Sequence, residues 1–144
     1  MIKKIYLVFL ILITGLISAQ NSLIRMPRIS PNSQEMAFSF QGDIWIYNFN
    51  TKQPNRITIH EGYESNPVWN QAGDQLAFSS NRKGANNVFT ISKDGGVPKQ
   101  LTYYPTADIP YDWTASNNIV FATTRVLKGP EWDEQIYHVD ANGG

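Results

Sequence analysis

The sequence of 144 residues predicts an all-β protein built from repeated units that follow an apolar N-terminal segment. Three observations lead to this prediction. A pattern of aromatic, proline and small residues recurs at an interval of about 40–44 residues. The apolar runs inside each unit are short, rich in β-branched and aromatic residues, and bounded by turn residues. Apolar residues at helical spacing are absent beyond the N-terminal segment.

Residues 1–19 have the layout of a secretory signal peptide, which would form a helix before removal. Two lysines precede an apolar run that ends at Ile17, and we expect cleavage after Ala19. The run is shorter than the roughly 20 residues that a membrane-spanning helix needs, so a stable membrane anchor is not expected. We therefore predict an exported chain, periplasmic or extracellular, whose mature part begins at residue 20.

The composition excludes several classes of function. The chain has no cysteine, which rules out disulfides, thiolate metal sites and a cysteine nucleophile. Its 12 basic and 12 acidic residues balance, and loss of the two N-terminal lysines leaves 10 basic residues against 12 acidic ones. Nucleic-acid binding requires a clustered excess of Lys and Arg, so no nucleic-acid partner is expected.

The first half of the unit occurs three times. Pro27 to Ser39 aligns with Pro67 to Ser79 at an offset of 40, and Pro110 to Ala122 follows at an offset of 43. Alternate side chains of a strand point to the same face, so two apolar residues per copy are expected to fill the contacts between units. These pairs are Met36 and Phe38, Leu76 and Phe78, and Ile119 and Phe121.

The second half of the unit also recurs, at residues 43–47, 87–91 and 135–139. Trp45, Phe89 and Tyr137 occupy one equivalent position and should pack in the same layer. Three polar residues open these strands, and their recurrence at one place indicates turn chemistry rather than catalysis: Asp43, Asn87 and Gln135. A fourth strand follows in the first two units, as RIT and QLT.

A unit of about 40–44 residues with four short strands is typical of a β-propeller blade. We therefore expect residues 20–144 to form an incomplete propeller of about three four-stranded antiparallel blades, at about 27–65, 66–107 and 108–144. The third blade is expected to be truncated, because the spacing of its strands places the last one near residue 149. Three blades alone are expected to aggregate or remain partly unfolded.

The sequence contains no recognisable catalytic constellation, and we expect no catalytic, cofactor-binding or metal-ligating residues. His60 lies in a loop and His138 in a strand, and neither has a second histidine at ligand spacing. The acidic group Glu131, Asp133 and Glu134 lacks the glycine and oxygen spacing of a calcium loop and is interpreted as a solvated loop. Nucleophile-elbow and phosphate-binding motifs are also missing.

The segment from Asn66 to Thr102 resembles the TolB-like, WD-like propeller repeat. That repeat has Pro, any residue, Trp-Ser-Pro-Asp-Gly and then an apolar-Ala-Phe strand. The second unit matches it at Pro67, Trp69, Gly73, Ala77 and Phe78, and the first at Pro27, Ser30, Pro31, Ala37 and Phe38. The Pro-Asp-Gly turn is degenerate in all three units.

Within this family, the chain resembles the start of an exported tricorn-type serine peptidase, because its repeats begin soon after the signal segment. The resemblance implies a non-catalytic propeller that guides or gates peptides toward a serine protease domain elsewhere in the parent. It also allows a homo-oligomer of the full-length protein. The alternative is a TolB-like periplasmic scaffold that binds a protein or glycan partner. Prolyl-oligopeptidase-type enzymes and some exported amidohydrolases carry such propellers too.

Overall fold

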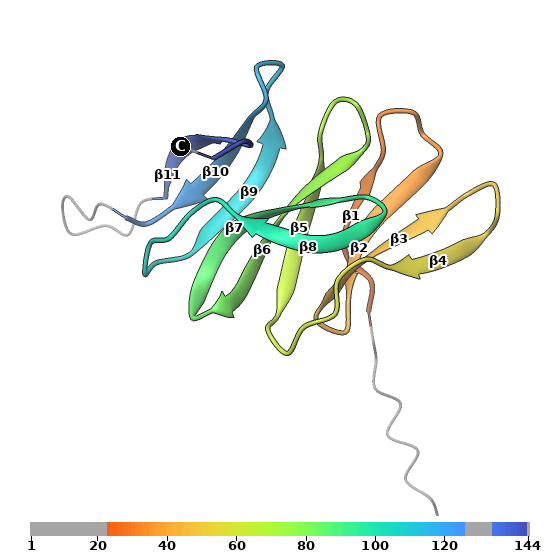
Figure 1. Ribbon diagram of the computed structural model, residues 1–144, viewed down its shortest axis with the longest axis horizontal. Helices are drawn as coiled ribbons and strands as arrows, with labels where there is room; N and C mark the ends of the chain where they lie inside the picture. The colour runs from red at the N-terminus through yellow and green to blue at the C-terminus, as the bar shows by residue number, and fades with distance from the viewer. Residues whose placement is uncertain (1–22, 126–133, 144) are drawn as a thin grey trace, which may run out of the picture.

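The computed structural model describes residues 23–125 and 134–143, which form eleven strands in three antiparallel sheets (Figure 1). The all-β prediction is therefore confirmed. The expected signal segment, residues 1–19, lies outside the described residues, and so do Glu131 and Asp133 of the acidic group. No helix in the described part of the chain has the length and apolar character needed to cross a membrane.

Each sheet corresponds to one repeat unit and is called a blade below. The first blade has the order β1-β2-β3-β4, with β1 at Arg25–Ile29, β2 at Glu35–Phe40, β3 at Asp43–Asn48 and β4 at Gln53–Arg56. The second has the order β5-β6-β7-β8, with β5 at Glu64–Trp69, β6 at Gln75–Lys83, β7 at Ala85–Ser92 and β8 at Gly95–Gln100. The third has the order β11-β10-β9, with β9 at Asp108–Trp113, β10 at Asn118–Thr123 and β11 at Gln135–Asp140.

The three blades lie side by side in sequence order, with the first strand of each blade next to that of its neighbour (Figure 1). β5 contacts β1 on one side and β9 on the other, so the second blade lies between the other two. The later strands of each blade fan outward from this inner row. This arrangement is that of consecutive blades in a propeller.

The backbone conformation of the turn between the first two strands of each blade explains why the sequence of this turn can vary. A left-handed residue closes this turn in every blade: Ser33 with φ 58°, Gly73 with φ 71° and Asn117 with φ 62°. Glycine and asparagine adopt this conformation most readily, and serine does so at some cost. The turn therefore requires a left-handed residue at its end but not a full Pro-Asp-Gly sequence.

Two buried apolar seams join the blades. The first seam combines Ala37, Ile44, Ile46 and Ile57 of the first blade with Trp69, Leu76, Phe78, Phe89 and Ile91 of the second. The second seam combines Val68, Ala77, Val88 and Leu101 of the second blade with Trp113, Ile119, Phe121 and Ala141 of the third, flanked by Tyr137 and Val139. The predicted layer is present, because Phe89 stacks on Phe78 and Tyr137 on Phe121, with ring centroids 5.9 and 6.0 Å apart.

The first blade departs from the predicted pattern of buried pairs. Met36 and Trp45 are only half-buried, although their counterparts in the second blade are fully buried. The reason is their position: they face away from the second blade, and no described sheet covers that side. The aromatic layer is thus complete only where a preceding blade is present.

An indole hydrogen bond also links each pair of blades. Trp69 Nε1 donates to the carbonyl oxygen of Arg28 at 3.0 Å, and Trp113 Nε1 donates to that of Val68 at 3.2 Å. Arg28 and Val68 occupy the same position in successive inner strands. The first blade has Ile29 at the tryptophan position, and this side chain is 53% exposed.

Candidate functional site

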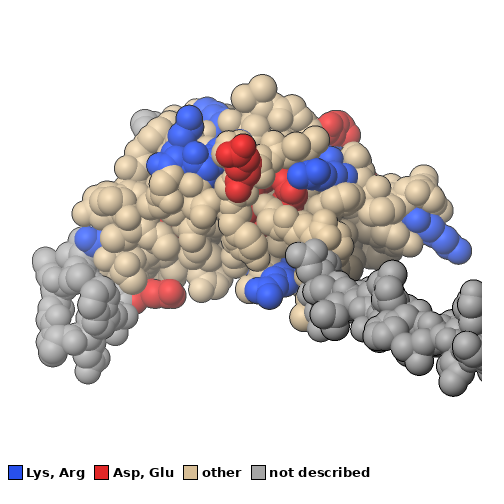
Figure 2. Space-filling model, turned by 90° about the horizontal axis from the view of Figure 1, so that it is seen from below, with Lys and Arg blue, Asp and Glu red and all other residues tan. Residues whose placement is uncertain are grey.

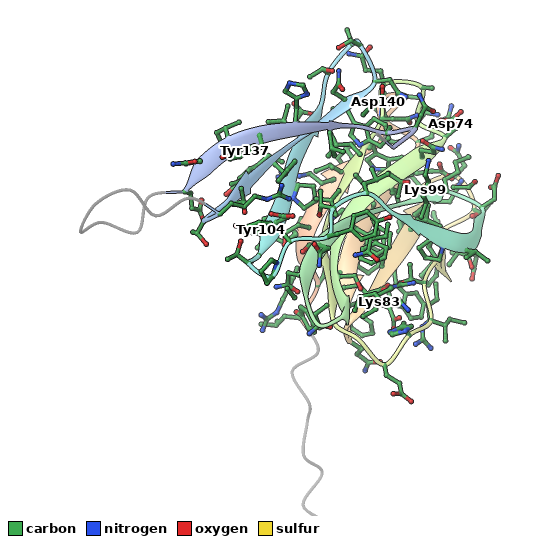
Figure 3. The ribbon with its side chains drawn as sticks, turned by 60° about the vertical axis from the view of Figure 1, so that its left-hand side comes forward. Asp74, Lys83, Lys99, Tyr104, Tyr137 and Asp140 are labelled. Atoms are coloured by element: carbon green, nitrogen blue, oxygen red, sulfur yellow. The ribbon has the colours of Figure 1, made fainter. Side chains whose placement is uncertain are left out.

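One end of the blades carries the segments that connect them, and we call it the loop face. It comprises the interblade segments 57–63 and 101–107, the turns at 41–42 and 81–84, and residues 124–125. The loop face is at the bottom of Figure 1 and faces the viewer in Figure 2, where basic and acidic side chains lie close together. Figure 3 shows Lys83 and Tyr104 toward this end, while Asp74 and Asp140 lie at the other.

A first groove, with a volume of about 870 Å³, opens on the loop face beside the inner strand of the first blade. Residues 39–42 form one wall and residues 60–63 the other, with Leu23 and Arg25 alongside. The hydroxyl of Ser39 is buried there without a hydrogen-bond partner among the described atoms. Gly62 N donates to His60 Nδ1 at 2.8 Å, which leaves Nε2 as the protonated nitrogen of a neutral ring. The groove therefore offers hydrogen-bond donors beside apolar surface.

A second groove, of about 430 Å³, lies between the turn after β6 and the next interblade segment. Lys83, Ala85 and Asn87 line one side, and Gln100 and residues 103–105 line the other. Tyr103 is 75% exposed, and its hydroxyl donates to Gln100 O at 3.0 Å. This groove thus combines an aromatic wall with a lysine.

The walls of the first groove are attached to the second blade. Tyr63 N donates to Asn81 Oδ1 at 2.7 Å, and Asn81 N donates to Tyr63 O at 3.3 Å. A Cβ on Gly62 would lie 2.9 Å from Asn81 Oδ1 and 3.0 Å from the backbone of Arg82. The close approach requires glycine at this position and holds the loop against the turn after β6.

Two buried acid–arginine pairs underlie the loop face. Asp108 is fully buried and is bound by both Nε and Nη2 of Arg125, at 3.2 and 2.5 Å. Glu64, at the equivalent position of the second blade and also fully buried, pairs with Arg82. Buried carboxylates require such partners, because an unpaired buried charge is costly. The two pairs therefore fix the starts of β5 and β9, the inner strands of the second and third blades.

Each of these arginines also covers the aromatic layer of its blade. Arg82 lies over Phe78 and Phe89, with its guanidinium carbon 5.8 and 5.1 Å from the ring centroids. Arg125 lies over Phe121 at 5.1 Å and Tyr137 at 5.7 Å, and it also contacts the Tyr104 ring at 5.0 Å. Arginine suits this position because its planar cation stacks on aromatic faces while it binds a carboxylate.

The acid–arginine pairs were missed in the sequence, although a signal exists. Arg82 and Arg125 align at the offset of 43 that relates the second and third units, whereas Glu64 and Asp108 are 44 residues apart and align only with a shift of one residue. In the structure both acids open the inner strand and lie opposite equivalent residues, Ser80 and Thr123. Burial lowers the pKa of Arg82, and the negative charge of Asp43 in the first blade offsets this in part by raising it. Asp43 itself pairs with Arg56 at 2.6 Å, so charges from two blades meet below the loop face.

The recurrent polar residues at the third strands hold the end of the fourth strand. The hydroxyl of Thr58 lies 3.5 Å from Asp43 Oδ1, and that of Thr102 lies 3.3 Å from Asn87 Oδ1. Gln135, at the same position of the third blade, accepts a hydrogen bond from the Tyr137 hydroxyl at 3.1 Å. Asp43 and Asn87 thus hold the segment after the fourth strand, whereas the hydrogen bond from Tyr137 to Gln135 stays within β11.

The two histidines do not come together, and only Glu134 of the acidic group lies in the described residues. His60 lies in the wall of the first groove, whereas His138 is exposed in the middle of β11, paired with Val120 of β10. Glu134 is exposed just before β11. Within residues 23–125 and 134–143, no three His, Cys, Asp or Glu side chains are grouped so that they could hold a metal ion.

Comparisons with known proteins agree with this architecture. The family described as "Tricorn protease N-terminal beta propeller domain" matches residues 21–144. The chain is 30% identical over 103 residues to "Uncharacterized peptidase YuxL" of Bacillus subtilis, covering 67% of this chain and 15% of that protein. It is 23% identical over 114 residues to "Putative Tricorn-like protease N-terminal subunit" of Sulfurisphaera tokodaii, covering 76% of this chain and 57% of the relative.

Among solved structures, "putative TolB from Agrobacterium tumefaciens" has the same fold, with a TM-score of 0.71 and 22% identity over 85% of this chain and 47% of that one. The chain thus spans less than two thirds of each of these proteins, between 15% and 57% of their lengths. The family match covers nearly all of the sequence, including every described strand. The chain belongs to the tricorn protease N-terminal β-propeller family.

Proposed function

We propose that the chain is a non-catalytic propeller segment of an exported tricorn-like peptidase. Its loop face would guide or gate peptide substrates on their way to a serine protease domain outside these 144 residues. The observation that carries this proposal is the pair of grooves on the loop face, each bounded by an interblade segment and a hairpin turn. Family membership supports the same role.

The chemistry of the grooves suits weak and sequence-tolerant peptide contacts. Tyr63, Tyr103 and Tyr104 are all at least 40% exposed on the loop face, and tyrosine offers large contact area at a small cost in conformational entropy. Arg25 and Lys83 can meet peptide carbonyls or carboxylates. A gate must release what it binds, and such contacts allow this.

Export is part of the proposal, and it rests on residues 1–19. Expression of the gene in its own host, followed by mass measurement of the mature N-terminus, tests it. A mature chain that starts at residue 20 in the periplasm or medium supports export. An intact Met1 in the cytoplasm contradicts it.

The peptide-guiding role is tested in the full-length parent protein with peptides of increasing length. We expect the double variant Tyr103→Ala, Tyr104→Ala to lower kcat/KM for long peptides by about 3- to 10-fold, because the two partly exposed rings together contribute on the order of 1 kcal/mol. Hydrolysis of very short peptides should be unchanged. Tyr111→Ala is the matched control, since Tyr111 is 50% exposed on an inner strand and lines neither groove.

A TolB-like scaffold that binds a protein or glycan is the second candidate, favoured by the exposed tyrosines, whose rings can stack on sugars or anchor a protein partner. The two candidates differ in the parent protein. Peptide hydrolysis together with labelling by a serine-directed reagent supports the peptidase. If neither is observed, the peptidase proposal fails and the scaffold remains.

A further inference from the structure

The second groove of the loop face differs from the first in its charge. The first groove is lined by both Arg25 and Glu61, whose charges are opposite. Among the described residues that line the second groove, Lys83 is the only charged one. Its walls belong to the second blade and to the segment that joins this blade to the third, and the second blade has four strands and a neighbour on either side. The second groove therefore presents an unbalanced positive charge.

The hairpin turn after β6 places Lys83 beside the groove. Lys83 and Ala85 lie opposite each other across Gly84, which adopts φ 107°. Gly84 N donates to Asn81 O at 2.9 Å and closes the turn. Because glycine adopts this conformation without a Cβ clash, the turn stays tight and holds the backbone of Lys83 next to the groove.

The described part of the chain does not neutralise the charge of Lys83. The neighbouring Arg82 forms an ion pair with Glu64, and Arg125 forms one with Asp108. Both acids are thus committed to arginines. Lys83 is exposed and forms no ion pair with a described residue. Its ammonium group therefore remains available to an anionic partner.

The two amide side chains of the groove are already engaged. Asn87 Nδ2 donates to Ala85 O at 3.0 Å, and Asn87 Oδ1 accepts a hydrogen bond from the Thr102 hydroxyl at 3.3 Å. Gln100 Nε2 donates to Thr102 O at 2.8 Å. A hydrogen bond from an ammonium group to a carboxylate is about twice as strong as one between neutral groups. Lys83 is therefore the side chain that can decide which ligand the groove prefers.

Two tyrosine rings supply the apolar part of the groove. Tyr103 and Tyr104 are 75% and 40% exposed. Their hydroxyls donate to Gln100 O at 3.0 Å and to Arg125 O at 3.4 Å. The guanidinium carbon of Arg125 also lies 5.0 Å from the centre of the Tyr104 ring. These contacts orient the rings, so that apolar surface and the Lys83 ammonium group are offered at the same end of the blades (Figure 3).

We propose that the second groove binds an acidic side chain of a peptide substrate. The carboxylate of an aspartate or glutamate lies against the Lys83 ammonium group, and the adjoining peptide atoms lie on the rings of Tyr103 and Tyr104. The inference rests on the proposed function for the peptide nature of the ligand. A chain end is a different case, because a terminal carboxylate is captured in a nest of backbone N–H groups, whereas the charge here is one side-chain ammonium group. Charge complementarity of this kind selects among partners more than it adds affinity.

The experiment uses the full-length parent protein, treated with a serine-directed reagent so that no bound peptide is cleaved. The probes are long peptides of alanine, serine and phenylalanine with one central glutamate, glutamine or lysine, a neutral fluorophore at the N-terminus and an amide at the C-terminus. Fluorescence anisotropy measures Kd. We expect the glutamate peptide to bind about 2- to 5-fold more tightly than the glutamine peptide, as for an exposed ion pair, and the lysine peptide to bind most weakly. The preference should disappear at about 1 M salt, where the screening length falls to roughly 3 Å.

Three protein variants locate the preference. Lys83→Gln should remove it, and Lys83→Glu should reverse it, so that the lysine peptide binds best. Lys52→Gln is the matched control, because Lys52 is exposed in the turn between β3 and β4 and lines neither groove, and it should keep the full preference. The proposed function can fail in the hydrolysis test while this preference persists. The preference can equally be absent while Tyr103→Ala, Tyr104→Ala still lowers kcat/KM for long peptides, so the two fail separately.

Several outcomes overturn the inference. No peptide binds saturably, or the glutamate and glutamine peptides bind equally, or the preference survives at high salt, or Lys83→Gln keeps the preference as fully as Lys52→Gln does. If a free C-terminal carboxylate raises the affinity and the central glutamate does not, the groove holds a chain end, and the inference is likewise wrong. The salt series needs no protein variant, so it decides even where a Lys83 variant does not fold.

Discussion

Arg125 combines three tasks in one side chain, because it neutralises a buried carboxylate, covers two stacked rings and contacts Tyr104 of the loop face. Lysine has no planar fork and cannot bind a carboxylate through two nitrogens while stacking on aromatic rings. Arg82 repeats the first two of these tasks, with Glu64 as the carboxylate and Phe78 and Phe89 as the rings. The arginines thus connect the packing between blades to the position of the loops.

Replacement of Arg125 alone is expected to lower the free energy of unfolding more than replacement of both Arg125 and Asp108. Arg125→Ala leaves Asp108 buried without a counter-charge and should lower the free energy of unfolding by about 3–5 kcal/mol. The double variant Asp108→Asn, Arg125→Met should lose less, because no unpaired charge remains. Urea unfolding of the longest stable form of the protein measures both.

Arg56→Ala is the control for this comparison. The side chain of Arg56 is 41% exposed, whereas that of its partner Asp43 is only 6% exposed. Asp43 keeps hydrogen bonds from the Thr58 hydroxyl and the His60 N–H when Arg56 is removed, so the loss should be smaller than for Arg125→Ala, about 1–2 kcal/mol. If Arg56→Ala and Arg125→Ala lowered the free energy of unfolding equally, the larger contribution expected of the Asp108–Arg125 pair would be contradicted.

At the scale of elements, the strands and seams were predicted from the sequence, whereas the acid–arginine pairs were not. Leu76 and Phe78 lie two residues apart within one strand, so alternation alone assigns them to a buried face. Glu64 and Arg82 are 18 residues apart, and each by itself looks like an ordinary surface charge. The relation becomes visible only when the second and third units are aligned on their charges, and the first unit, with Ile24 in place of the acid, hides it.

The turn between the first two strands offers a test at this scale. Ser33 adopts φ 58° where the second blade has glycine. Ser33→Gly should therefore stabilise the protein by about 0.5–1 kcal/mol, because glycine tolerates this conformation without the Cβ penalty. Thermal unfolding of Ser33→Gly beside Ser33→Ala measures the effect. A gain for alanine as large as that for glycine would contradict the conformational explanation.

At the scale of the whole molecule, the described blades leave two outer sides uncovered. On the first blade, Ile24, Met26 and Ile29 are each more than 50% exposed, and on the third Ile136 is 67% exposed. Internal seams bury the equivalents of Ile29 and Ile136, which are Trp69 and Val88 in the second blade. Such surfaces favour association, because apolar area is removed from water when they meet.

Residues 20–144 alone are therefore expected to self-associate or remain partly unfolded. Sedimentation velocity over a range of concentrations should show a mass that rises with concentration. Ile29→Lys should reduce this association, since it places a charge on the uncovered side of the first blade. A sharp, concentration-independent two-state melt of a monomer would rule the expectation out.

The indole hydrogen bonds give the row of blades a polarity. Each tryptophan donates back to the inner strand of the preceding blade, at Arg28 and then at Val68. The equivalent carbonyl of the third blade belongs to Asp112, the residue before Trp113. The first blade has Ile29 at the tryptophan position and therefore has no indole donor there. A duplicated unit joined after the third blade would find its acceptor already in place, but one joined before the first would not be met by an indole. We therefore expect tandem duplication of this unit to lengthen the row of blades more readily after the third blade than before the first.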